Sequence, residues 1–324
     1  MFLRAVLAEG RGEVEVVAGN DLVPLDGVAY LLEYDSVFGR LEHPVSAGDG
    51  ELKIGDKSIK VFSEREPKEI PWGDEGVQVV VESTGLFTER AKAASHLDGG
   101  AERVVISAPA KDVDATFVYG VNHQDFDAAN HQVVSNASCT TNCFVPMVKV
   151  LDDAFGVDKG LMTTVHAYTA TQAIVDGASR EKDLRGTRAA ALNVIPSSTG
   201  AAKATSLVLK EMAGRLDGQS LRVPVPDGSF TDFSCVLKKP AKVDEINEAF
   251  RAAAASGPLA KGVLVYSTDP IVSSDIVGSS ASCTFDAPFT MVIDELVKVG
   301  GWYDNEWGYS NRLVDLIRHI GTTS

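Results

Sequence analysis

The chain has 324 residues, 44% of them hydrophobic, a formal net charge of −15 and four cysteines. This length and composition predict a globular protein with one large core or two, and the acidic balance excludes a protein whose main partner is nucleic acid, because neutralising a phosphate backbone takes clustered Lys and Arg. Four scattered cysteines exclude a disulfide framework or a paired-cysteine zinc site, and no apolar run approaches the roughly 20 residues that span a bilayer, so we expect a cytoplasmic protein with reduced thiols, no metal and no membrane segment.

The first part of the chain alternates strand-like runs with helical stretches. Residues 1–10 are expected to form the end of an amphipathic helix, with Gly10 as its stop. Strands or hairpin arms are expected at 13–19, 52–62, 77–83, 103–107, 116–121 and 132–135, and helices at 25–33 and 90–97. Alternation of this kind predicts a parallel, doubly wound sheet, an architecture that binds dinucleotides.

Residues 135–143, Ser-Asn-Ala-Ser-Cys-Thr-Thr-Asn-Cys, follow the last of these strands and open a further helix. Ser138 is a candidate N-cap, so Cys139 would lie in the first helical turn. A helix N-terminus and a neighbouring imidazole both lower the pKa of a thiol, and His166 follows 27 residues later in a β-branched strand. The pattern therefore predicts a cysteine nucleophile with a histidine as its base.

The remaining thiols and imidazoles have simpler interpretations. A buried core thiol is the alternative for Cys139, but its polar neighbours disfavour a core position. Cys143, one helical turn further on, has no base of its own and is interpreted as a packed or redox-sensitive spectator. The other five histidines are interpreted as structural; they are His43, His96, His123, His131 and His319.

Beyond the Cys139 helix the strands become longer and alternate strongly. Strands are expected at 160–168, 221–225, 231–237 and 296–303, helices at 201–212, 243–254 and 311–320, and a long loop at 176–193. This pattern predicts a second, α+β domain with a mixed, largely antiparallel sheet backed by helices.

Seven ordered blocks of sequence resemble phosphorylating glyceraldehyde-3-phosphate dehydrogenases along nearly the whole chain. The blocks are residues 82–85, 106–111, 135–143, the strand that holds His166, 195–203, 222–226 and 302–311. The resemblance implies a Rossmann-type NAD-binding domain at 1–138, completed by a C-terminal helix at 306–324, and a catalytic domain at 139–305. It also implies NAD as cofactor, a small-molecule substrate, inorganic phosphate as co-substrate and a homotetramer.

The resemblance also implies the chemistry of the candidate residues. Cys139 would attack the aldehyde of glyceraldehyde 3-phosphate, and His166 would accept the hydroxyl proton as hydride passes to NAD. Phosphate would then release 1,3-bisphosphoglycerate from the thioester. The substrate phosphate would be held by Thr169 and Arg222, and the attacking phosphate by Ser138, Thr140, Thr199 and Gly200.

The cofactor contacts follow from the same resemblance. The implied residues are Asp21, Arg65, Thr84, Gly85, Ser107, Asn305 and Tyr309. An acidic side chain at position 21 would bind the ribose hydroxyls and repel a 2′-phosphate, which favours NAD over NADP. From the residues alone, however, Asp21 also fits a plain strand-end turn, and Thr199-Gly200 a plain turn before a helix.

The chain departs from the family at its start. Members open with a strand and a Gly-x-Gly-x-x-Gly turn for the pyrophosphate, but Gly10-Arg11-Gly12 and Gly48-Asp49-Gly50 both lack the third glycine. We therefore expect a truncated Rossmann sheet without its central strand, and weak NAD binding. Two alternatives stay open, an erythrose-4-phosphate dehydrogenase with the same motifs, and a catalytically impaired, truncated homologue that acts as a binding protein.

Overall fold

The computed structural model describes residues 1–8, 14–178 and 183–323, and the chain divides into two compact units. The first unit comprises Met1–Phe117, Asp125–Asn136 and Leu313–Ser324, and the second comprises Val118–Gln124 and Ala137–Arg312. No helix among the described residues has the length and apolar character needed to cross a membrane.

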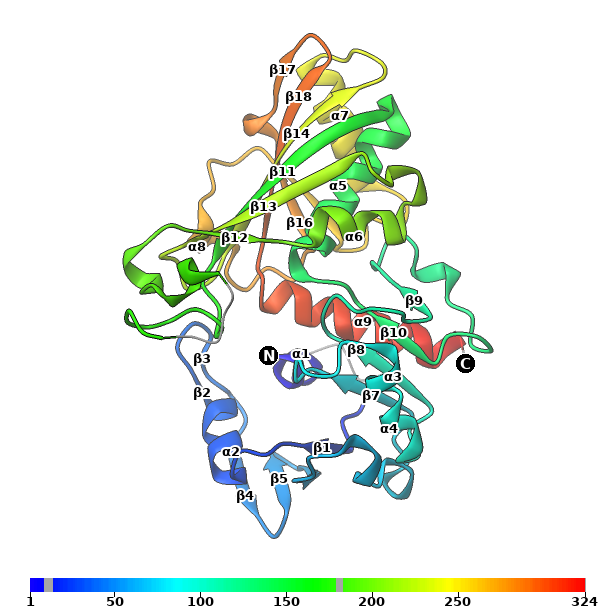
Figure 1. Ribbon diagram of the computed structural model, residues 1–324, viewed down its shortest axis with the longest axis vertical. Coiled ribbons are helices and arrows are strands. Elements are labelled where there is room, and N and C mark those ends of the chain that lie inside the picture. The colour runs from blue at the N-terminus through cyan, green and yellow to red at the C-terminus, as the bar shows by residue number, and fades with distance from the viewer. Residues whose placement is uncertain (9–13, 179–182, 324) are drawn as a thin grey trace. The chain divides into compact units, whose positions relative to one another are not determined.

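The first unit contains two four-stranded sheets (Figure 1). In the order in which they pair, their strands are β1 (Ala18–Asn20), β6 (Lys57–Phe62), β5 (Glu51–Ile54) and β4 (Val45–Gly48), and then β7 (Val79–Glu82), β8 (Arg103–Ile106), β10 (Val133–Ser135) and β9 (Ala115–Thr116). The second of these sheets is wholly parallel, and β1 runs parallel to β6. Within the described residues, β1 and β7 are each paired on one side. The predicted Rossmann-like, parallel α/β class is confirmed.

Short helices accompany these strands in the first unit. They are α1 (Phe2–Leu7), α2 (Leu25–Glu33), α3 (Arg90–Ala93) and α4 (Ser95–Asp98), and a small ribbon joins β2 (Tyr34–Asp35) to β3 (Gly39–Arg40). The bounds of α2 are those predicted. The helix expected at 90–97 is instead interrupted at Ala94, and α1 ends because Ala8 is extended. The expected stop at Gly10 and the start of the expected strand at Glu13 lie outside the described residues.

The strand expected at 116–121 is wrong beyond its first residue. The backbone N–H of Val118 donates to the side-chain Oδ1 of Asn122 at 2.8 Å, and Val121 N–H donates to Val118 O at 3.0 Å. These bonds fold the segment into a turn, so β9 ends at Thr116. An Asn side chain that satisfies a nearby backbone donor competes in this way with a strand ladder.

The second unit is built on one large mixed sheet (Figure 1). In pairing order its strands are β12 (Ile195–Ser198), β13 (Leu216–Val223), β11 (Val157–Ala167), β14 (Ser229–Leu237), β18 (Leu296–Tyr303), β16 (Cys283–Asp286) and β15 (Leu264–Ser267), with β17 (Met291–Ile293) beside β18. Its parallel pairs are β11 with β13 and β15 with β16; the others are antiparallel. The predicted mixed, largely antiparallel sheet is confirmed.

Helices α5 (Cys139–Phe155), α6 (Ala201–Val208) and α7 (Val243–Ala255) pack against this sheet and form the main core with it. The short α8 (Ser273–Ile276) contacts β18, and α9 (Trp307–Thr323) begins in the second unit. The inward face of α5 buries Phe144, Met147 and Leu151 completely, and the Phe144 ring meets Phe233 of β14 edge-on at 4.8 Å. Burial of each such side chain contributes about 1.5–3 kcal/mol to the stability of the fold. The helix that begins at Cys139 is therefore held firmly against the sheet.

The loop expected at 176–193 is irregular, as its composition predicts. Its described part holds two short 3₁₀ helices, η4 (Leu184–Thr187) and η5 (Ala190–Leu192). Residues 179–182 of this loop lie outside the described residues.

Candidate active site

A strained turn presents Cys139 at the start of α5. Ala137 has a left-handed backbone with φ of +56°, and its carbonyl accepts a hydrogen bond from the Tyr309 hydroxyl at 3.0 Å. Ser138 then caps the helix, since its Oγ accepts the N–H of Thr141 at 3.1 Å. A non-glycine residue in this conformation is unfavourable and is often found at functional sites. The predicted helix start is confirmed, with Cys139 as the first residue of α5.

His166 lies directly beside this thiol. Its Nε2 is 3.4 Å from Cys139 Sγ, and its Nδ1 is 2.7 Å from the carbonyl oxygen of Ala167. The imidazole is 3% exposed on β11, on the strand face that also buries Thr164. A proton on Nδ1 that is donated to Ala167 leaves Nε2 free to accept a proton from the thiol. The predicted pairing of a thiol with an imidazole is therefore present in the structure.

Arg222 completes this group from the neighbouring strand. It lies opposite His166 in the β11–β13 ladder, and its Nη1 donates to the Ala167 carbonyl at 3.0 Å. Nη1 is also 2.8 Å from His166 Nδ1, but with the ring proton on Nδ1 both groups are donors, so this contact is not a hydrogen bond. Its Nε is buried and has no hydrogen-bond partner among the described residues. A buried, unpaired donor on a guanidinium is costly unless an acceptor completes it. Arg222 is thus suited to bind an anion next to the Cys139–His166 pair.

The pKa values of Cys139 and His166 correct one expectation. Burial raises the pKa of the Cys139 thiol to about 11, although Arg222 and backbone N–H groups of the first helical turn act to lower it. Burial, and then the charge of Arg222, lower the pKa of His166 to about 4. We had expected a lowered thiol pKa. The helix start and the imidazole are in place, but removal of the thiol from water outweighs them, and both groups are neutral at pH 7.

Tyr303 is a part of the site that sequence reasoning missed. Its hydroxyl lies 2.8 Å from Oγ1 of Thr140 and 2.7 Å from Oγ1 of Thr164, and all three residues are buried. Its ring also meets the His166 imidazole edge-on at 5.8 Å. The Thr140 hydroxyl, a predicted phosphate contact, is therefore engaged with Tyr303. This hydrogen-bonded group ties the first turn of α5 to the strand that carries the imidazole.

The other predicted phosphate contacts lie further along the sheet. Thr169 follows the end of β11, and its Oγ1 donates to the side chain of Gln172 at 3.0 Å. Thr199 and the exposed Gly200 precede α6, and Thr199 Oγ1 accepts the N–H of Ala201 at 3.2 Å. No hydrogen bond among the described residues joins these three to Cys139 or the guanidinium. Their phosphate roles stay predictions.

Asn305 offers a second unpaired donor near the imidazole strand. Its Oδ1 accepts the Ser229 hydroxyl at 2.6 Å, and the same hydroxyl accepts the N–H of Ala167 at 3.1 Å. This bond fixes the amide so that Nδ2 is buried, and Nδ2 has no partner among the described residues. An amide held in this way is complementary to a carboxamide oxygen. Asn305 thus fits the nicotinamide end of the predicted cofactor.

The first unit presents two of its predicted cofactor residues at neighbouring strand ends. Asp21 follows β1 and Arg65 follows β6, and both side chains are exposed. The Asn20 side chain links the two loops, since its Nδ2 donates to Glu64 O at 3.0 Å and its Oδ1 accepts Glu64 N–H at 2.8 Å. The carboxyl ends of parallel strands are where open α/β sheets bind ligands, so this placement is compatible with a ribose site.

Thr84, Gly85 and Ser107 lie at the carboxyl ends of β7 and β8. The N–H of Ser107 donates to the Glu82 carbonyl at 2.9 Å, which holds the two strand ends together. Gly85 has φ of +74°, a conformation that favours glycine. The Thr84 N–H donates to Oε1 of Glu82 at 2.8 Å, and the Thr84 hydroxyl contacts the same oxygen. The loop after β7 is therefore fixed by the carboxylate that precedes it.

Sequence reasoning also missed the buried group that holds this carboxylate. His96 Nε2 is 2.9 Å from Glu82 Oε2, and Trp72 Nε1–H donates to His96 Nδ1 at 3.1 Å. Because Nδ1 accepts, the ring proton lies on Nε2 and is donated to Glu82. Burial raises the pKa of Glu82, but the bonds from His96 and Thr84 outweigh burial, and the net direction is downward. The histidine that we interpreted as structural therefore supports a predicted cofactor loop.

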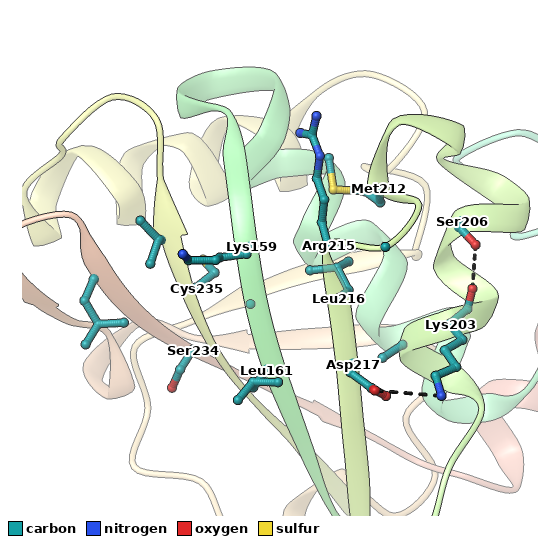
Figure 2. Close-up of a pocket in the computed structure, with 15 residues that line it drawn as sticks. Lys159, Leu161, Lys203, Ser206, Met212, Arg215, Leu216, Asp217, Ser234 and Cys235 are labelled. Carbon is teal, nitrogen blue, oxygen red and sulfur yellow. Dashed lines mark hydrogen bonds and ion pairs between the residues drawn. The ribbon is translucent and has the colours of Figure 1, made fainter.

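A separate cavity of about 840 Å³ opens on the second unit, away from the Cys139 site (Figure 2). Figure 2 shows Lys159 and Leu161 of β11, Arg215 and Leu216 near the start of β13, and Lys203 of α6 around it. None of the predicted site residues lines this cavity. Within the described part of the chain, no group of three His, Cys, Asp or Glu side chains is placed to hold a metal ion.

Comparison with known protein families identifies both parts of the chain. Residues 138–305 match the glyceraldehyde 3-phosphate dehydrogenase C-terminal domain, and residues 1–90 match the glyceraldehyde 3-phosphate dehydrogenase NAD binding domain.

Individual relatives are similar over nearly the whole chain. The glyceraldehyde-3-phosphate dehydrogenase of Streptomyces coelicolor is 56% identical over 321 residues, which is 99% of this chain and 94% of the relative. The enzyme of the same name from Mycobacterium avium is 56% identical over 325 residues, with the same two shares covered. Glyceraldehyde-3-phosphate dehydrogenase 2 of Streptomyces arenae is 56% identical over 311 residues, 96% of this chain and 92% of the relative.

Proposed function

The chain belongs to the glyceraldehyde-3-phosphate dehydrogenase family, and from this premise we propose how its own residues carry the reaction. It is an NAD-dependent oxidoreductase of glycolysis that converts D-glyceraldehyde 3-phosphate and inorganic phosphate to 1,3-bisphosphoglycerate. The names of its relatives favour this activity over oxidation of erythrose 4-phosphate and over a non-catalytic binding protein.

The contact between Cys139 Sγ and His166 Nε2 at 3.4 Å is the observation that carries the mechanism. With its Nδ1 proton held by the Ala167 carbonyl, His166 takes the thiol proton through Nε2 as the sulfur attacks the aldehyde carbon. Because both groups are neutral at pH 7, proton transfer and attack go together. The backbone N–H groups at the start of α5 favour negative charge on the former carbonyl oxygen.

His166 then serves as the base a second time. It first returns the thiol proton to the former carbonyl oxygen, which gives the hydroxyl of the hemithioacetal. It then accepts this proton again as the carbon loses hydride, which leaves the acyl group on sulfur as a thioester. When bound, NAD supplies the hydride acceptor for this oxidation. Inorganic phosphate attacks the thioester, the carbon–sulfur bond breaks, and the thiolate regains the proton that His166 holds. The high free energy of the thioester is retained in the acyl phosphate.

The phosphate groups are held next to this pair. We propose that Arg222 binds the substrate phosphate together with Thr169, and its buried, unpaired Nε supports this role. Ser138, Thr140, Thr199 and Gly200 are proposed to receive the attacking phosphate. The engagement of Thr140 Oγ1 with Tyr303 means that Thr140 would act in part through its backbone N–H. Helix N-terminal N–H groups bind phosphate well.

The candidate cofactor residues are compatible with both the nicotinamide end and the adenosine end of NAD. Asn305 would bind the nicotinamide carboxamide through its unpaired Nδ2, with Tyr309 nearby. Asp21 would bind the adenosine ribose hydroxyls, and Arg65, Thr84, Gly85 and Ser107 would supply the contacts between. We propose that residues 1–138, completed by 306–324, form the NAD-binding domain and that 139–305 form the catalytic domain. The family matches at 1–90 and 138–305 support this division.

We propose that the chain assembles as a homotetramer in the cytoplasm. The four cysteines are free, as expected of a protein in a reducing compartment. Large apolar side chains are exposed along β11, β17 and β18; they are Leu161, Met291, Ile293 and Leu296. Leu161 and Leu296 also line the cavity in Figure 2. Exposed apolar side chains gathered in this way are typical of a subunit interface. Light scattering should give four copies, and Leu161→Glu should reduce that number.

The test of the function is the phosphate dependence of NADH formation. With glyceraldehyde 3-phosphate and no phosphate, we expect a burst of about one NADH per active site as the thioester accumulates. Added phosphate should restore continuous turnover, and hydroxylamine should trap an acyl phosphate. Erythrose 4-phosphate should be a much poorer substrate. Continuous turnover without phosphate, with a free acid as product, would instead support the hydrolytic alternative.

A further inference from the structure

Two aspartates meet in the interior of the second unit, behind Asn305. Asp227 lies in the turn before β14 and Asp304 directly follows β18, and each is 1% exposed. Ser229 pairs with Tyr303 at the end of the β14–β18 ladder, so the two aspartates lie at the same end of this ladder. Asp227 Oδ1 accepts the N–H of Gly228 at 2.7 Å, whereas its buried Oδ2 has no hydrogen-bond partner among the described residues.

The unpartnered Oδ2 of Asp227 can bond to the Asp304 carboxyl group only if one of the two carries a proton, because two carboxylates have only acceptors. Asp304 accepts three backbone N–H groups, from Gly278 at 2.7 Å, Glu306 at 2.9 Å and Trp307 at 2.6 Å. Asp227 accepts one. Hydrogen bonds to the charged form favour that form. Asp304 is therefore the carboxylate of the pair, and Asp227 carries the proton and donates it.

The charges around Asp227 agree with this assignment. Burial first, and then the negative charge of Asp304, raise the pKa of Asp227 to about 8, and Glu306 adds in the same direction. The charged side chains that act on Asp227 are thus both acidic, one from the end of β18 and one from the turn before α9. The hydrogen bond from the Gly228 N–H acts in the opposite direction.

The two aspartates lie in the two segments that hold the Asn305 amide. Asp227 precedes Gly228 and Ser229, and Asp304 precedes Asn305. The Ser229 hydroxyl donates to Asn305 Oδ1 at 2.6 Å and accepts the N–H of Ala167, next to the base. The carboxyl pair thus lies immediately behind the bond that aims Asn305 Nδ2.

We propose that Asp227 is a positioning residue, whose protonated carboxyl group donates to Asp304 and thereby holds Asn305 in place for the nicotinamide carboxamide. This inference rests on the proposed cofactor role of Asn305. Above pH about 8 the proton is lost, and two carboxylates are left in contact in the interior. Because two buried negative charges at the same end of the ladder repel each other, the segments separate, the Ser229–Asn305 bond weakens, and NAD binds less tightly.

The first test is calorimetric NAD titration between pH 6.5 and 9.5. Asp227→Asn keeps a donor to Asp304 at every pH, so its dissociation constant should stay flat, while that of the unmodified protein should rise roughly tenfold, as expected for loss of a hydrogen bond to a charged group. Asp227→Leu removes the donor and should bind weakly throughout. Asp232→Asn, at a half-buried ion pair with Lys298, is the matched control and should follow the unmodified protein. An equal alkaline loss in Asp227→Asn would overturn the proposal.

The second test is the pH dependence of thermal stability without NAD. The pKa of Asp227 in the folded chain lies above its unfolded value of about 3.9, so the folded state binds the proton more tightly between these values. Its contribution to stability is full below the unfolded pKa and is lost as the pH rises towards 8. The melting temperature of the unmodified protein relative to Asp227→Asn should therefore fall between pH 4.5 and 8.5 and level off above. A constant difference would overturn the shared proton.

The two readouts separate this inference from the proposed function. If the stability difference depends on pH but NAD affinity does not, the carboxyl pair exists and the positioning role is refuted. If the unmodified protein shows no phosphate-dependent aldehyde oxidation at any pH, it is the proposed function that fails.

Discussion

The two units organise their candidate residues in different ways. In the second unit, Cys139, His166 and Arg222 form one contiguous group on packed elements, with contacts of 2.8 to 3.4 Å. In the first unit, the candidates lie at the ends of two separate sheets, and Asp21 and Arg65 are exposed. Bond making and breaking needs fixed distances, so misplacement by an ångström costs rate. Binding of a long dinucleotide can instead be shared among many weak contacts.

The units also differ in what sets the charge of their buried groups. In both, burial opposes the charged form. For Glu82 in the first unit, the bonds from His96 and Thr84 outweigh burial, so its pKa is lowered and it is a carboxylate. For Cys139 in the second unit, Arg222 and the backbone N–H groups do not outweigh burial. The first unit therefore holds a fixed charge that shapes a loop, and the second keeps its candidate thiol and imidazole neutral at pH 7.

The largest effect should come from Cys139→Ser. A serine hydroxyl is a far weaker nucleophile than the thiol, and no thioester can form, so aldehyde oxidation should fall below detection. Stoichiometric labelling by iodoacetamide at neutral pH should be lost with it. The matched control is Cys143→Ser, one turn along α5 and fully buried, which should keep most of both. Labelling of the Cys139→Ser protein at an unchanged rate would show that another thiol is the nucleophile.

Replacement of the base should have the next largest effect. His166→Asn removes the acceptor at 3.4 Å from the thiol, and turnover should fall by roughly 10²–10⁴-fold, the range typical of a positioned acid–base group. Alkylation of Cys139 at neutral pH should also slow, because no acceptor at Nε2 is left to take the thiol proton. His131→Asn, at a histidine of the first unit, is a suitable control. An unchanged rate of alkylation would contradict the role of His166.

The sequence was most informative where local rules decide the structure. The bounds of α2 and the start of α5 follow from periodicity and from the Ser138 cap, and the confirmed fold class follows from the alternation of elements. The short strands β15 and β16 were missed, because a run of four residues is too short to show the period that separates a strand from a loop.

The site was less predictable where its contacts are distant in sequence. Thr140 and Tyr303 are 163 residues apart, and only the folded sheet brings their hydroxyls together. Asp227 lies in Pro-Asp-Gly, a sequence typical of an exposed turn, yet Asp227 is only 1% exposed. The raised thiol pKa was missed for a similar reason, since burial is a property of the whole fold and helix position alone does not reveal it.

The smallest effect should come from the exposed edge of the first unit, and it would sharpen the comparison most. Asp21→Asn keeps the shape of the side chain and its bond to the N–H of Val23 while removing the negative charge. Loss of the charge-assisted bonds to the ribose should weaken NAD binding only about 3- to 20-fold, because an exposed contact is screened by water. The repulsion of a 2′-phosphate should also fall, so NADP should bind relatively better. Calorimetric titration with both cofactors measures this ratio, with Asp26→Asn in α2 as the control. If Asp21→Asn instead abolished NAD binding, the cofactor contacts would be as concentrated as the catalytic ones, and the contrast between the two units would not hold. If the ratio of NADP to NAD affinity stayed the same, Asp21 would be a strand-end turn residue and not a ribose contact.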